Sequence, residues 1–183
     1  MNINQYKIKI QKLVNEIDEN FINLLVNKIK STKKKGGKVF IVGNGGSIST
    51  ATHISVDLTK NAKIKTFQLY NNNLITCYSN DYGYEKWVSK AIDHFLNSKD
   101  LVIFLSVSGN SKNLLNAAKN CIKKKISAVA LSGHSKKNKL NKIVKNNFWV
   151  NSKSYNQVEI IHFIILCLVV DKIVGREIYG TKL

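Results

Sequence analysis

Two short apolar runs in this chain each pass directly into a loop of small polar residues. KVFIV at 38–42 leads into GNGGS, and LVIFLS at 101–106 leads into VSGNS. Each loop precedes a segment whose apolar residues recur at helical spacing. Strands that end in this way belong to parallel sheets, where ligands bind beyond the carboxyl ends of the strands. We therefore expect the two loops to converge at one edge of a sheet.

The rest of the chain alternates strand-like and helical segments in the same manner. Further strands are expected at 65–70, 126–132 and 146–150, and helices near 3–33, 47–60, 111–124 and 155–175. Five strands alternating with helices predict an α/β fold, a three-layer α/β/α sandwich around a five-stranded parallel sheet.

The chain has 183 residues and no linker rich in Pro, Gly or Ser, so we expect a single domain over 1–183. Residues 1–35 would form a long N-terminal oligomerisation helix, and 36–183 the sheet core and the closing helix. Both of these helices carry more apolar residues than one subunit's core needs, which predicts a homo-oligomer.

The formal net charge of +18 raises the question of nucleic-acid binding. Of the 29 basic residues only Arg176 is arginine, and the lysines are scattered through every segment. Base-reading and bidentate phosphate sites favour arginine, so we do not expect a nucleic-acid partner.

No apolar run approaches the ~20 residues of a membrane span, and the N-terminus lacks a signal-peptide core. Three widely separated cysteines show no metal-binding spacing, which indicates reduced thiols. We therefore expect a cytoplasmic protein without a membrane partner.

The serine-rich loop has the chemistry of a phosphate-binding site. Ser106, Ser108 and Ser111 surround a Gly-Asn turn before a helix, whose N-terminus offers unpaired N–H groups and a partial positive charge. The alternative is that these serines only cap the helix, for which one would suffice.

Directly after GNGGS, Ile48 stands where the dinucleotide fingerprint needs its third glycine, so a close backbone turn beside a small sugar fits better.

The segments VGNGGS, SNDYGY and LSVSGNS occur in that order, with His53 following the first. Together they resemble the SIS (sugar isomerase) domain family, in particular its phosphoheptose isomerase branch. The resemblance covers nearly the whole chain. It implies a homotetramer with sites at subunit interfaces and conversion of sedoheptulose 7-phosphate to a heptose 7-phosphate, often with zinc. It further implies a site with the following residues: Ser106, Ser108 and Ser111 on the phosphate, Asn44, Gly45 and Ser47 against the sugar, and Asp81 in the same pocket.

Aldose–ketose isomerisation needs a base and an acid. The base of the family is a glutamate, and Asp57 stands at its position, four residues after His53 and on the same helix face. Aligning Glu159 with the family's Gln-Glu pair puts Leu166 at the catalytic histidine. His162 lies one turn earlier on the same face. It could serve as the acid, or it could be a helix histidine satisfied by a neighbour.

His53 and Asp57 are the two zinc-ligand positions that remain, whereas zinc usually takes about four ligands. We therefore expect no required cofactor and leave a weak zinc site open. The leading function is a sugar-phosphate isomerase acting on a heptose phosphate or a related phosphosugar. The alternative is a non-catalytic phosphosugar-binding SIS protein that acts as a sensor or an assembly scaffold.

Overall fold

A computed structural model describes residues 2–176 of the chain. Its five strands are β1 (Val39–Val42), β2 (Thr66–Phe67), β3 (Leu101–Ser106), β4 (Ser127–Ser132) and β5 (Asn147–Trp149). Its helices are α1 (Ile3–Asn15), α2 (Glu19–Lys34), α3 (Gly46–Lys60), α4 (Asn72–Tyr82), α5 (Trp87–Phe95), α6 (Lys112–Lys123), α7 (Lys139–Ile143) and α8 (Tyr155–Val174).

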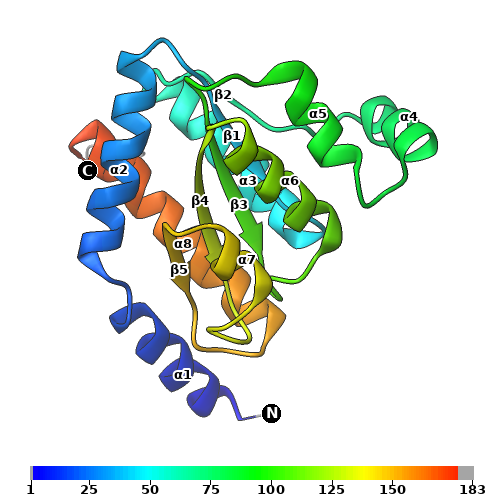
Figure 1. The fold of residues 1–183 in the computed structure, drawn as a ribbon. Coiled ribbons are helices and arrows are strands. Elements are labelled where there is room, and N and C mark those ends of the chain that lie inside the picture. Colours follow the sequence, from blue (N-terminus) through cyan, green and yellow to red (C-terminus); the bar gives the residue numbers. More distant parts are fainter. Residues whose placement is uncertain (1, 177–183) are drawn as a thin grey trace.

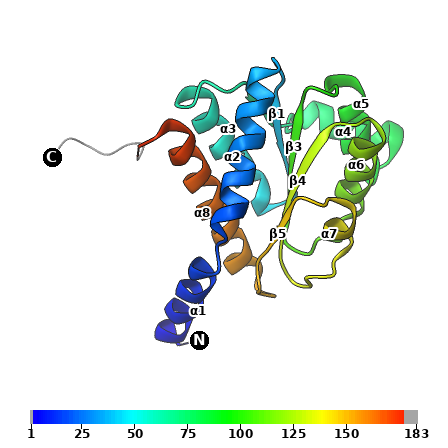
Figure 2. The same ribbon diagram turned by 60° about the vertical axis from the view of Figure 1, so that its left-hand side comes forward.

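All strand pairs are parallel, and the strand order is β2-β1-β3-β4-β5 (Figure 1). Figure 2 shows α2, α3 and α8 on one face of the sheet and α4 to α7 on the other. One apolar core fills each interface between sheet and helices. The central strand β3 is buried along its whole length because helices cover both of its faces. The structure thus confirms the predicted three-layer α/β fold.

The prediction of a single helix over 3–33 is wrong, because residues 16–18 are not helical and separate α1 from α2. Asp18 caps α2 by accepting a hydrogen bond from the Asn20 N–H at 2.9 Å. In both views α1 projects away from the sandwich (Figures 1 and 2), and Leu13 is its one buried residue.

The second strand is also shorter than expected. β2 pairs with β1 only through Thr66 and Phe67, after which the chain leaves the sheet. Among residues 2–176, no helix combines the length and the apolar character needed to cross a bilayer.

Candidate functional site

The loops that follow β1 and β3 meet at the carboxyl edge of the sheet, as the sequence predicted. The two strands are parallel neighbours, and Val42 at the end of β1 pairs with Phe104, two residues before β3 ends, so both loops begin at the same edge. The loops line one cavity of about 70 Å³, here called the serine cavity. Its polar lining consists of Asn44, Ser47, Ser106, Ser108 and Ser111 from the loops, and Tyr155 and Glu159 from α8.

The first loop is a tight turn into α3. Gly45 occupies the N-cap position with φ +54° and ψ −127°, a conformation that favours glycine. A Cβ at Gly43 would lie 2.6 Å from Cβ of Ser47, so the backbone there has no room for a side chain. The turn brings Ser47, which is 4% exposed, to the wall of the cavity.

Asn44 ties the first loop to the helix that follows the second. Its side-chain amide exchanges two hydrogen bonds with that of Asn113 on α6, at 3.0 and 2.9 Å. The Tyr84 hydroxyl donates a third hydrogen bond to Asn44 Oδ1 at 3.2 Å. Asn113 and Tyr84 were missed by sequence reasoning, although Tyr84 belongs to the SNDYGY segment.

The serines of the second loop differ in how they are already engaged. The Ser106 hydroxyl is buried and has no hydrogen-bond partner among residues 2–176. Ser108 Oγ accepts a hydrogen bond from the Asn110 N–H at 3.2 Å. Ser111 occupies the N-cap position of α6, yet its side chain makes no capping hydrogen bond in the described structure. Helix capping alone therefore does not account for these serines, and an anion at the α6 N-terminus would satisfy them.

The shape of the second loop depends on a distant segment. Gly109 has φ +62°, and a Cβ there would lie 2.2 Å from the Asn138 side chain. The Leu140 N–H donates to the Gly109 carbonyl at 2.9 Å. Asn138 is itself fixed, because its amide donates to Ser132 Oγ at 2.9 Å.

A carboxylate also belongs to the cavity. A Cβ built on Gly46 would lie 2.5 Å from Glu159 Oε2, so this carboxylate sits against the first residue of α3. The partial positive charge of the helix N-terminus stabilises a negative charge there. The sequence analysis used Glu159 only to align α8 with the family and did not predict it in the site. Its position in the first turns of a helix that follows a strand could have indicated a place at the carboxyl edge of the sheet.

Tyr70 holds the start of the first loop from the opposite side. Its hydroxyl donates to the Gly43 carbonyl at 2.8 Å and accepts a hydrogen bond from the Gly43 N–H. Burial raises the pKa of the Tyr70 phenol above its usual value, which keeps the hydroxyl protonated as a donor.

Residues 5–133 match the profile of the SIS domain. The chain belongs to the SIS domain family. A phosphoheptose isomerase of Campylobacter concisus is 36% identical over 118 residues, which are 61% of this chain and only 62% of that protein. Phosphoheptose isomerase 1 of Campylobacter jejuni is 32% identical over 148 residues, 76% of this chain and 79% of that protein.

A solved structure of a phosphoheptose isomerase from Francisella tularensis has the same fold, with a TM-score of 0.86 and 23% identity. That alignment covers 95% of this chain and 97% of the other. These findings confirm the resemblance stated from the sequence: the chain is a phosphoheptose isomerase-like SIS protein.

In this SIS chain the predicted base and its histidine lie away from the serine cavity. His53 Nε2 and Asp57 Oδ2 are 3.2 Å apart on α3, and neither residue lines the cavity. The ten residues from Ser47 to Asp57 correspond to about 15 Å along the helix at ~1.5 Å per residue. The His53 side chain is 54% exposed, and its ring packs against Phe163 of α8 at 5.0 Å between centroids.

The described residues contain no donor set of the kind that a four-ligand zinc site needs. No group of three His, Cys, Asp or Glu residues within 2–176 could hold a metal ion. Cys167 of α8 is near Asp57, but burial and the charges of Asp171 and Asp57 raise the pKa of its thiol to about 11.

His162 faces the core of the SIS domain and does not reach the serine cavity. It is 1% exposed, and its Nε2–H donates to the Ser132 carbonyl at 3.3 Å. Burial lowers the pKa of the imidazole to about 4. Leu166, aligned above with the catalytic histidine of the family, and Val158, which precedes Glu159, are buried in the same core. His162 thus lies outside the serine cavity of its own chain, and its role as the acid stays a prediction.

Asp81 is likewise outside the serine cavity in this chain. It lies near the end of α4, a helix without buried residues. Its carboxylate accepts hydrogen bonds from Cys77 Sγ at 3.6 Å and Asn80 Nδ2 at 3.1 Å. The SNDYGY segment contacts the site through Tyr84 instead.

Proposed function

We propose that this SIS protein interconverts the ketose and aldose forms of a phosphorylated sugar of the heptose 7-phosphate class. The serine cavity carries the proposal. It combines an unpaired buried hydroxyl on Ser106, an N-cap serine without its capping bond, and the N-termini of α3 and α6. A phosphate group matches these donors in charge and in hydrogen-bonding capacity.

The position of the carboxylates agrees with a long substrate. The carbonyl chemistry of a heptose 7-phosphate takes place at C1 and C2, at the other end of the molecule from the phosphate. Glu159 lies within the phosphate end of the site, whereas Asp57 lies farther along α3. We therefore propose Asp57 as the base that takes a proton from C1 of the ketose, giving an enediol that is reprotonated at C2. The reaction only moves protons, so it consumes no oxidant or reductant.

The two packed helices around Asp57 also support an oligomer. Large apolar side chains are exposed on α3 and α8 around it: Val56 at 55%, Ile160 at 38% and Leu168 at 45%. Exposed apolar side chains on two packed helices support an interface between copies of the chain. We propose a homo-oligomer on this basis, with the tetramer of the family resemblance as its form.

A second candidate function is supported by the buried imidazole of His162. With this ring in the core, the lining of the serine cavity includes proposed phosphate donors and no histidine. This pattern suits an SIS protein that binds a phosphosugar without converting it, as a sensor or an assembly scaffold.

One experiment separates the two functions. Purified protein is incubated with ketose and aldose phosphates of five to seven carbons, with and without added Zn²⁺, and interconversion is followed by NMR. We expect turnover of a heptose 7-phosphate and no requirement for Zn²⁺. Binding of a phosphosugar by calorimetry without any turnover would favour the sensor or scaffold function.

A further inference from the structure

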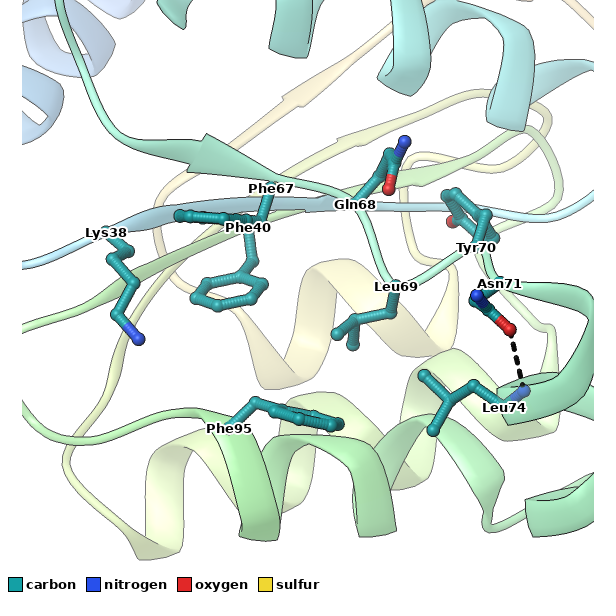
Figure 3. A pocket seen from close by; sticks show the side chains of 9 residues that line it. All are labelled: Lys38, Phe40, Phe67, Gln68, Leu69, Tyr70, Asn71, Leu74 and Phe95. Carbon is teal, nitrogen blue, oxygen red and sulfur yellow. Dashed lines mark hydrogen bonds between the residues drawn. The ribbon is translucent and has the colours of Figure 1, made fainter.

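A second, larger cavity lies at the β2 edge of the sheet, between the strands and the end of α5. Its volume is about 470 Å³. We call it the aromatic pocket. It is lined by Lys38, Phe40, Phe67, Gln68, Leu69, Tyr70, Asn71, Leu74 and Phe95, none of which lines the serine cavity (Figure 3).

The walls of the aromatic pocket suit a flat apolar body. Figure 3 shows Phe40 and Leu69 projecting from the strand side toward Phe95 at the end of α5. The rings of Phe40 and Phe67 stack, with centroids 5.7 Å apart and an angle of 27°. Phe67 and Phe95 are 48% and 47% exposed, so ligand binding would bury apolar surface. Pockets for small molecules typically span about 300–1,000 Å³ and combine such walls with a few polar groups.

The polar groups select for negative charge. Lys38 is the one charged residue among the nine that line the pocket. Its Nζ lies 6.0 Å from the ring centre of Phe40 and 5.9 Å from that of Phe67. A ligand that stacks on these rings would therefore place a carboxylate or sulfonate within reach of the ammonium group. Charge complementarity thus assigns the occupant as an anion.

The aromatic pocket is connected to the first loop of the serine cavity by one side chain. Tyr70 lines the pocket, and its hydroxyl makes both hydrogen bonds to the Gly43 backbone. Its ring also packs edge-on against the buried Trp87, at 6.4 Å between centroids. A ligand that shifts Tyr70 must move or break its bonds to Gly43, because Trp87 restricts the ring on another side.

We propose that the aromatic pocket binds a planar apolar anion of the aryl carboxylate or sulfonate class, and that its occupancy is transmitted through Tyr70 to the GNGGS loop. The site is an effector site, separate from the phosphosugar site. It does not depend on the proposed isomerase activity.

The binding test uses 1-naphthoate as the probe and 1-naphthamide as its neutral counterpart, with dissociation constants from calorimetry on the full-length protein. We expect the amide to bind about two- to fivefold more weakly. Lys38→Met should remove this difference, whereas Lys119→Met, at an exposed position of α6, should preserve it. Absence of naphthoate binding at millimolar concentration, or equal binding of both probes by the wild type, would overturn the proposal.

The coupling test follows the Gly43 amide resonance in isotope-labelled protein. Naphthoate should shift this resonance in the wild type, and the shift should be lost in Tyr70→Phe, which keeps the ring but lacks the hydroxyl. An unmoved Gly43 resonance at saturation would overturn the coupling. Light scattering of Phe67→Asp and Phe95→Asp supplies a second check: a lower assembly mass would show that a copy of this chain covers the pocket, which overturns the effector site.

Discussion

The serine cavity and the His53–Asp57 pair are both attached to α3, but they are built in different ways. The cavity forms where adjacent parallel strands end, and its donors are held by backbone turns and by the Asn44–Asn113 amide pair. In the pair, His53 is half exposed and Asp57 is buried, where α3 packs against α8. The proposed phosphate site is therefore complete within one folded chain, whereas the proposed proton transfer depends on what packs against α3 and α8.

The largest expected effect is the loss of turnover in Asp57→Asn. Removing a general base typically costs 10²–10⁴-fold in rate, so kcat should fall by about that factor. The affinity for phosphosugar should stay nearly unchanged, because Asp57 does not line the serine cavity. Coupled enzymatic assays and calorimetry measure the two quantities.

Glu159→Gln is the matched control at the other carboxylate. We expect turnover within a few-fold of wild type. The affinity for phosphosugar should rise, since a negative charge beside the proposed phosphate site is removed. The reverse pattern, with turnover lost in Glu159→Gln and kept in Asp57→Asn, would assign the base to Glu159.

A mixing experiment tests whether Asp57 acts across a subunit interface. If it does, mixing Asp57→Asn subunits with subunits that carry both Ser106→Ala and Ser111→Ala should restore turnover.

His162 belongs to neither region, and its protonation should affect stability instead. Because its folded pKa of about 4 is below the unfolded value near 6.5, the unfolded chain binds more protons between these pH values. Above pH 6.5 the ring is neutral in both the folded and the unfolded chain. As the pH falls from 6.5 toward 4, the free energy of unfolding decreases. The loss should reach up to about 3 kcal/mol, at ~1.36 kcal/mol per pH unit.

Urea unfolding of wild type and His162→Leu at pH 7, 5.5 and 4.5 measures this loss. The variant should show a smaller decline, while His94→Gln, at an exposed position, should follow the wild type. A strong fall in turnover of His162→Leu at pH 7, with stability intact, would instead support its role as the acid.

Within the serine cavity, Ser106→Ala should weaken phosphosugar binding by about 1–3 kcal/mol, the usual cost of leaving a buried partner unpaired. Unfolding should not become easier, because the hydroxyl has no partner in the described structure. Calorimetry and urea unfolding measure both effects, and Ser49→Ala, at an exposed position of α3, is the control. Unchanged affinity in both Ser106→Ala and Ser111→Ala would remove the phosphate site.

The smallest expected effect belongs to Tyr84→Phe, which deletes one exposed hydrogen bond to Asn44. Phosphosugar affinity should fall by about 0.5–1.5 kcal/mol, the net value of a typical hydrogen bond. Tyr82→Phe, on the neighbouring α4, should have no effect. A Tyr84→Phe loss as large as that of Ser106→Ala would mean that Tyr84 contacts the ligand itself.

The features that local sequence determines were predictable. Apolar runs that end in glycines and serines predicted β1, β3 and β4, and the loops after β1 and β3 that meet at the sheet edge. The break at 16–18 was missed because the apolar spacing continues through Ile17, although Asp18 is a capping residue type. Contacts such as Glu159 against Gly46 and the inward direction of His162 arise from how α8 packs on the sheet, which spacing along one helix cannot define.

The contact between Gly109 and Asn138 has a consequence for the order in which the protein matures. The loop at 106–111 leaves the ribosome almost thirty residues before the segment that shapes it. Until β4 and α7 have docked, Gly109 lacks both its Asn138 neighbour and the hydrogen bond from Leu140. We therefore expect the serine motif of a nascent chain to lack its folded shape, and the proposed phosphate site to form only late in synthesis. A nascent chain stalled before residue 138 should carry every serine of the motif and still fail to retain a phosphosugar.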